Sequence, residues 1–195
     1  GGVDSMVLTK VLIEKGYQLG LAHVNYKLRA EESDLDEALI RDFATENNVP
    51  FYCKECPLNQ ISHIQEDARK LRYAFFENLK SEFGYHFILT AHHADDQIEG
   101  FFLHLFRGSG LKGLSGMDVR SGDLIRPFLS FRKAEILEYA IANNIPFRQD
   151  QSNSSTYYSR NFLRNEIFPL LQKRFPSFDE MVLRSMDHIH HQKIY

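Results

Sequence analysis

The stretch that decides the fold is GGVDSMVLTKVLIEKG, residues 1–16. Its glycine pair tolerates backbone angles that are closed to other residues, which suits a tight turn whose N–H groups point into one concavity. Ser5 adds a hydroxyl donor, and apolar residues recur at helical spacing from Met6 to Leu12, so the turn leads into a helix. The positive N-terminal end of that helix faces the same concavity and favours an anion, usually phosphate. Because such a turn normally follows a buried strand, we expect the chain to be part of a longer protein.

The composition is that of a soluble globular protein. A chain of 195 residues with 43% hydrophobic and 25% charged residues can bury a sizeable core, which argues against disorder. No apolar run approaches the ~20 residues that span a bilayer, so we expect no membrane association. The two cysteines, Cys53 and Cys56, cannot form a disulfide framework, which indicates a reducing, cytoplasmic location.

The net charge of −3 conceals a division along the chain. Residues 31–46 carry seven acids against Arg41 alone and should repel phosphate. Basic residues outnumber acids in 107–133 and in 158–174, so a polyanion would meet the later half of the chain. The alternative is that these charge runs are ordinary solvated faces.

Short apolar runs alternate with helical patterns in the first half of the chain. The predicted strands are 19–25, 49–53 and 87–91, and the predicted helices are 33–47 (with Ser33 as N-cap), 64–82 and 95–107. This alternation predicts an α/β fold, doubly wound, with a mainly parallel sheet and helices on both faces. Ligands of such sheets bind beyond the carboxyl ends of the strands, which directs attention to 1–5, 23–29 and 92–99.

The chain changes character after Gly108. We expect a mobile glycine-rich loop, a strand-like segment, a helix capped by Ser130, a polar loop and two further helices. The corresponding ranges are 108–116, 124–128, 130–144, 150–157, 158–173 and 177–192.

An acidic cluster follows the third predicted strand, in TAHHADDQIEG, residues 90–100. Asp96 and Glu99 are three residues apart at the start of a helix, so both carboxylates lie on one face. The ordinary interpretation is that they complement the helix dipole. Four ionisable side chains between His92 and Asp96 exceed what capping requires, and acids there suit Mg²⁺ or an incoming ammonium group.

Seven segments together resemble the tRNA(Ile)-lysidine synthase family of PP-loop ATP pyrophosphatases. They are GGVDS (1–5), HVNYKLRAEESD (23–34), IQEDARKLRY (64–73), TAHHADDQIE (90–99), RGSGLKGLSGM (107–117), LIRPFL (124–129) and DQSNSSTYYSRNFLRNEIFPLL (150–171). The resemblance covers almost the whole chain, and its most specific element is RNFLRNEIFP, which other PP-loop enzymes lack. It implies a PP-loop catalytic domain over 1–176, without the first strand and the first serine of the loop. Residues 177–195 would then be a helical tail or a linker to further C-terminal domains.

The resemblance also implies the chemistry. ATP would adenylate the C2 oxygen of the wobble cytidine in a tRNA(Ile) with a CAU anticodon. The side-chain amine of L-lysine would then displace AMP and leave lysidine. The implied partners are tRNA(Ile), L-lysine, ATP and Mg²⁺, and a homodimer is left open.

The same resemblance assigns roles to residues. The ATP-binding candidates are Gly1, Gly2, Val3, Asp4, Ser5, His23 and Asn25, the Mg²⁺ candidates are Asp4 and Asp95, and the catalytic candidates are Asp96, Glu99, Arg72 and Arg164. Asp96 and Glu99 would hold the lysine amine and remove its proton. Arg72 and Arg164 would grip the substrate carboxylate or the ATP phosphates.

Each of these assignments has an alternative. Arg72 would otherwise decorate a helix surface, Arg164 would pair with Glu166 or Asp150, and His23 would be a satisfied histidine at a strand end.

Two other functions compete with the ligase. The C-x-x-C spacing of Cys53 and Cys56 is compatible with a PP-loop tRNA thiolase, although there is no third cysteine. A non-catalytic nucleotide-binding module would use the same turn but would leave the acidic cluster without a role.

Overall fold

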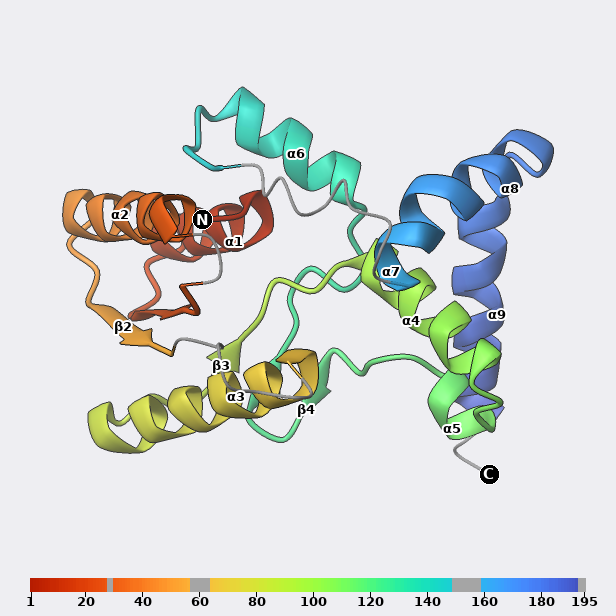
Figure 1. The fold of residues 1–195 in the computed structure, drawn as a ribbon, viewed down its shortest axis with the longest axis horizontal. Helices are drawn as coiled ribbons and strands as arrows, with labels where there is room; N and C mark the ends of the chain where they lie inside the picture. The colour runs from red at the N-terminus through yellow and green to blue at the C-terminus, as the bar shows by residue number, and fades with distance from the viewer. Residues whose placement is uncertain (28–29, 57–63, 149–158, 193–195) are drawn as a thin grey trace. The chain divides into compact units, whose positions relative to one another are not determined.

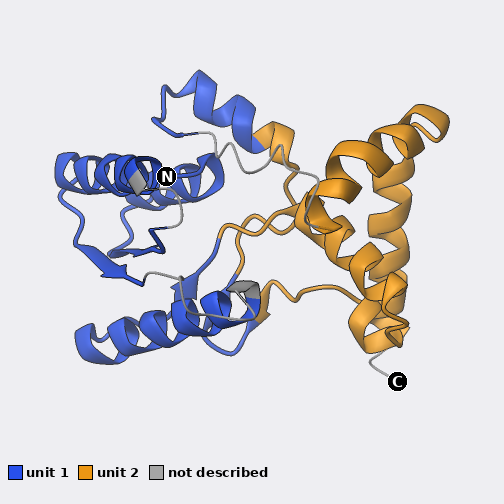
Figure 2. Ribbon diagram, in the orientation of Figure 1, with its two compact units in different colours: residues 1–90, 121–125, 136–149 blue, residues 91–120, 126–135, 150–195 orange. Residues whose placement is uncertain are grey.

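The structure is a computed structural model that describes residues 1–27, 30–56, 64–148 and 159–192 (Figure 1). It divides into two compact units (Figure 2). Unit 1 comprises residues 1–90, 121–125 and 136–149, and unit 2 comprises residues 91–120, 126–135 and 150–195. The predicted loop 150–157, with Asp150, lies outside the described residues.

The strands form two sheets, each with a parallel pair, in agreement with the predicted α/β fold. β1 (Leu21–Asn25) pairs with β2 (Phe51–Glu55) in parallel, with Leu21 opposite Phe51 and Asn25 opposite Glu55. β3 (Ile88–Leu89) pairs in parallel with β5 (Leu124–Ile125), in the order β3-β5-β4, where β4 is Arg120–Ser121. β1 and β3 are shorter than the apolar runs that predicted them, and β2 lies two residues later than its predicted range.

Unit 1 also contains helices. They are α1 (Val3–Glu14), α2 (Ala30–Glu46), α3 (Ile64–Phe83) and α6 (Lys133–Ala142), of which α6 begins in unit 2. α2 packs on β1 and β2, and α3 packs on β3. α1 buries Val3, Met6, Val7 and Leu8, so the helix that follows the glycine turn is fixed by its apolar side.

Two predicted helix starts are wrong. Ser33 lies inside α2, because the helix begins at Ala30 and places Glu31 and Glu32 in its first turn, where they complement the dipole. Ser130 does not cap the next helix, which begins at Lys133. There the Glu135 carboxylate accepts a 2.6 Å hydrogen bond from the Arg132 N–H and so caps the helix from within.

Unit 2 is helical. It contains α4 (Ala94–Phe106), α5 (Leu111–Leu114), α7 (Ser159–Phe162), the π-helix η2 (Leu163–Ile167), α8 (Phe168–Arg174) and α9 (Phe178–Gln192). The predicted loop 108–116 contains α5, and the predicted helix 158–173 is interrupted by η2. No described helix is long and apolar enough to cross a membrane.

One aromatic core holds unit 2 together. Ile98, Leu163, Phe168 and Phe178 are buried in it, and the Phe102 ring lies 5.4 Å from that of Phe168, centroid to centroid. The cluster joins α4 to η2, α8 and α9. α9 shares this core, and the predicted domain boundary after residue 176 stays a prediction.

Candidate active site

The predicted phosphate turn lies at the start of α1 in unit 1. Gly2 is the N-cap, with an extended backbone (φ −71°, ψ 151°) and no capping side chain. The Ser5 hydroxyl donates a 2.9 Å hydrogen bond to the Gly2 carbonyl. The first N–H groups of a helix have no partner within the helix, so this turn carries the positive end of α1.

Asn25 ends β1 and is 1% exposed. Its amide nitrogen donates 3.0 Å hydrogen bonds to Asp34 and Glu37 of α2, and its amide oxygen accepts one from the Lys27 N–H. Asn25 therefore ties the end of β1 to α2. Its contact with a nucleotide stays a prediction.

His23 and Arg72 also lie at this end of β1. Burial lowers the pKa of His23, which keeps its imidazole neutral near pH 7. Tyr26, just past β1, donates a 2.8 Å hydrogen bond to the Ala68 carbonyl of α3. Burial raises the pKa of Tyr26 and the charge of Arg72 opposes that rise, so Arg72 is near the strand end.

The acidic cluster lies at the N-terminus of α4 in unit 2. His93 is the N-cap, and Asp96 accepts a 3.0 Å hydrogen bond from its N–H in a capping box. Asp96 thus serves the helix terminus, as the ordinary interpretation of the sequence held. Its part in substrate binding stays a prediction.

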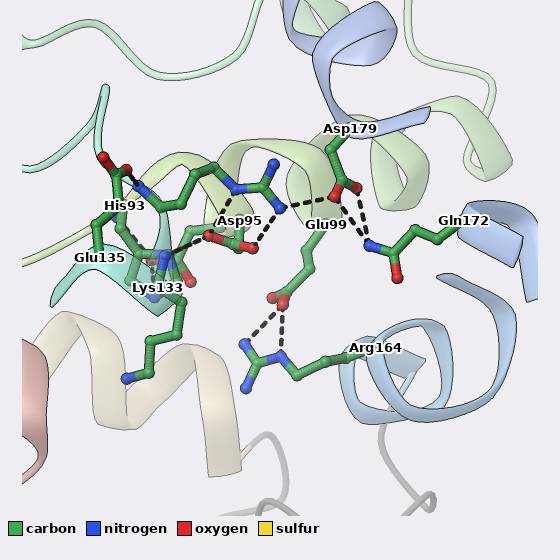
Figure 3. Close-up of polar contacts among 10 residues, drawn as sticks. His93, Asp95, Glu99, Lys133, Glu135, Arg164, Gln172 and Asp179 are labelled. Carbon is green, nitrogen blue, oxygen red and sulfur yellow. Dashed lines mark hydrogen bonds and ion pairs between the residues drawn. The ribbon is translucent and has the colours of Figure 1, made fainter. Parts of the chain in front are cut away.

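Asp95 is held by donors from α6 and the residue before it (Figure 3). Its carboxylate accepts hydrogen bonds from Arg132 Nη2 at 2.9 Å and from the Lys133 N–H at 2.7 Å. Burial favours the neutral acid, but bonds from His93, Arg132 and Lys133 outweigh it and hold the pKa of Asp95 well below its usual range. Arg132 also donates to Asp179 of α9 at 2.7 Å.

This arrangement bears on the predicted magnesium site. Both Asp95 oxygens accept hydrogen bonds within unit 2, so an ion at Asp95 would share this carboxylate with Arg132 and Lys133. Within the described parts of the chain, no three His, Cys, Asp or Glu side chains are grouped as a metal site. Asp4 lies in the first turn of α1, in the other unit.

Glu99 is the most buried acid of the cluster, at 1% exposure. Arg164 Nε and Nη2 both lie 2.6 Å from its Oε1, whereas Oε2 has no hydrogen-bond partner among the described residues. Burial raises the pKa of Glu99, and Arg164 partly offsets that rise. Arg164 is presented by η2, and π-helical turns are frequent at functional sites. Arg164 therefore pairs with Glu99 rather than with Glu166.

Glu99 and Arg164 line a cavity of about 260 Å³. Its lining residues are His93, Asp95, Ile98, Glu99, Lys133, Arg164, Phe168, Gln172 and Asp179. The lining offers both carboxylates and cations, which suits a small ligand that carries both charges. Sequence reasoning missed Lys133, Gln172 and Asp179 as site residues, because only the packing of α6, α8 and α9 brings them to α4.

The candidates are divided between the units. Gly1 to Ser5, His23, Asn25 and Arg72 lie in unit 1, and Asp95, Asp96, Glu99 and Arg164 lie in unit 2. A cleft that both sets share stays a prediction.

Comparisons with known proteins identify the family. Residues 1–171 match the model of the PP-loop domain. The chain is 39% identical to a tRNA(Ile)-lysidine synthase of Chlorobaculum tepidum, over 90% of this chain and 56% of that protein. It is 37% identical to a tRNA(Ile)-lysidine synthase of Parabacteroides distasonis, over 97% of this chain and 44% of that protein. The chain thus spans about half the length of the curated relatives it matches.

Among solved structures, the chain is similar to the U34-tRNA thiolase NcsA from Methanococcus maripaludis with its 4Fe-4S cluster. The TM-score is 0.75 at 17% identity, over 98% of this chain and 69% of that chain. At this identity the likeness shows a common fold. These matches confirm the resemblance seen in the motifs, and the chain belongs to the PP-loop domain family.

Proposed function

We propose that the chain carries the catalytic part of a tRNA(Ile)-lysidine synthase, a ligase that forms a C–N bond. It would use ATP to adenylate the C2 oxygen of the wobble cytidine of tRNA(Ile) and release pyrophosphate. L-Lysine would then displace AMP and give lysidine. The names of the similar proteins support this reaction. A cytoplasmic location and a homodimer stay predictions.

The observation that carries the proposal is Oε2 of Glu99, a buried oxygen that has no hydrogen-bond partner among the described residues. A carboxylate at 1% exposure, fixed through Oε1 by Arg164, leaves Oε2 to accept a hydrogen bond from an ammonium group in the cavity. Glu99 then takes a proton from that ammonium, and the neutral amine attacks C2 of the adenylated cytidine as AMP leaves. Burial raises the pKa of Glu99, which suits a general base. Asp96 adds negative potential beside it.

The first step is assigned to unit 1. The turn from Gly1 to Ser5 binds the ATP phosphates through the positive end of α1 and stabilises the charge that builds on the departing pyrophosphate. His23 and Asn25 lie beside the nucleotide, and Arg72 contacts a phosphate or the lysine carboxylate. Mg²⁺ would partly neutralise the phosphates, with Asp4 and Asp95 as its proposed contacts.

The test is incubation of the protein with ATP, radiolabelled lysine and unmodified tRNA(Ile). Label should enter the RNA, and pyrophosphate exchange should require tRNA. A non-catalytic nucleotide-binding module would show neither reaction. Incorporation of sulfur in place of lysine would overturn the proposal.

A further inference from the structure

The acidic helix α2 lies against the first residue of the phosphate turn. A Cβ placed on Gly1 would come within 3.3 Å of Asp36 Oδ1. Asp36 is also close to His23. Its negative charge partly offsets the lowering of the His23 pKa that burial causes. A carboxylate at this position repels an anion bound at the turn, because like charges a few ångströms apart interact strongly where water is partly excluded. The turn therefore needs a nearby cation.

Arg148 supplies that cation. Its Nε donates a 3.0 Å hydrogen bond to Asp36 Oδ1, and its Nη2 pairs with Glu32 on the same helix. Its backbone N–H donates a 2.9 Å hydrogen bond to the Gly1 carbonyl. One residue thus contacts the turn and two acids of α2.

The other paired acids of α2 use different cations. Lys27 pairs with Asp34, and Arg41 pairs with Glu37 within the helix. Arg148 pairs with acids of α2 and also bonds directly to Gly1 through its backbone N–H. Arg148 is therefore placed to control the charge at the phosphate turn.

We propose that Arg148 is a positioning residue for ATP, which neutralises Asp36 and Glu32 and fixes the Gly1 carbonyl so that a polyphosphate can occupy the turn. The inference rests on the proposed function of the turn as the ATP site. It also accounts for an acidic helix beside a phosphate turn, since the acids that should repel phosphate are paired.

The test compares variants with the wild type in two measurements. These are ATP binding by calorimetry and the KM for ATP in pyrophosphate exchange. Arg148→Gln should weaken ATP binding about tenfold at low salt, which corresponds to ~1.4 kcal/mol. The loss should shrink to about threefold at high salt, because a shorter Debye length screens the partly exposed carboxylates of Asp36 and Glu32. The turnover number kcat should change less than KM. Arg148→Lys should bind ATP within about threefold of the wild type, because it keeps the charge.

Two further variants separate charge from structure. Asp36→Asn in the Arg148→Gln background should restore most of the ATP affinity, and this double variant also serves if Arg148→Gln alone fails to fold. Lys70→Gln is the matched control, because Lys70 forms an exposed pair with Glu66 on α3. It should bind ATP as the wild type does.

The outcomes are distinct. If the wild type does not bind ATP, the proposed function of the turn is refuted. If the wild type binds ATP but Arg148→Gln binds equally well at low salt, or if Asp36→Asn restores nothing, the role of Arg148 is refuted and the ATP site stands.

Discussion

Arg164→Met removes the cation that pairs with Glu99. Two nitrogens of Arg164 lie 2.6 Å from one oxygen of a carboxylate that is 1% exposed. Methionine keeps much of the apolar stem of arginine, so the substitution chiefly removes charge and hydrogen bonds. Unit 2 should then hold a buried carboxylate without its cation.

The expected loss of stability is about 2 kcal/mol near neutral pH. Breaking a fully buried ion pair costs ~3–5 kcal/mol, and the Arg164 side chain is 40% exposed, so water already weakens this pair. The loss should depend on pH. Burial raises the pKa of Glu99, and removal of Arg164 raises it further, so folded Glu99 binds its proton more tightly than unfolded Glu99 does. Stability is then lost as pH rises through the folded pKa.

Urea unfolding at about pH 4.5 and about pH 8 measures this effect. Arg164→Met should lower the free energy of unfolding only slightly at the lower pH, where protonation removes the charge of Glu99. It should lower that free energy most at the higher pH. In a Glu99→Gln background the same substitution should cost much less, because no charge is left to isolate. Arg184→Met, at an exposed position of α9, is the matched control. Equal costs at both pH values, or an unchanged cost in the Glu99→Gln background, would refute the reasoning.

Four further predictions concern the chemistry and the backbone. Glu99→Gln should reduce lysine incorporation about 100-fold and reduce pyrophosphate exchange far less, because the base acts on the amine; equal losses would contradict that role. Cys53→Ser with Cys56→Ser should retain lysine incorporation within about twofold, whereas loss of activity would favour sulfur transfer. Gly116→Ala should lower the free energy of unfolding by about 2 kcal/mol, because φ is +77° and a Cβ would lie 2.6 Å from a methionine methyl group. Gly100→Ala, where a Cβ meets nothing within 4 Å, should raise the free energy of unfolding by about 1 kcal/mol in a denaturation assay. A change of the same sign in the two glycine variants would contradict the two glycine predictions.

The sequence predicted the fold where local patterns decide it. Apolar runs bounded by polar residues located β1 and β2, and helical periodicity located α3 and α9 nearly to the residue. Helix starts were less predictable. α2 begins before Ser33 because acids can stabilise its first turn, and Glu135 caps α6 from inside the helix, so a serine alone did not mark either start.

The site was predictable only in part, because its contacts join distant segments. Glu99 was recognised from its spacing to Asp96, but its partner Arg164 lies 65 residues further along the chain. Arg132 reaches Asp179 across 47 residues, in a helix that was expected to be a tail. Such contacts depend on how the phenylalanines of α4, α8 and α9 pack. Local sequence does not contain that information.

Fold alone does not decide between ligation and sulfur transfer, since the similar thiolase has the same fold at 17% identity. The chemistry of two acids separates the functions. Burial and the neighbouring Glu37 carboxylate raise the pKa of Cys53 to about 12, which disfavours the thiolate that sulfur chemistry needs near neutral pH. Glu99 instead lines a cavity, has a buried oxygen without a hydrogen-bond partner among the described residues, and has a carboxyl whose pKa is raised by burial, which suits an amine. An amine is a substrate of the ligase and not of the thiolase, so the geometry of Glu99 favours ligation.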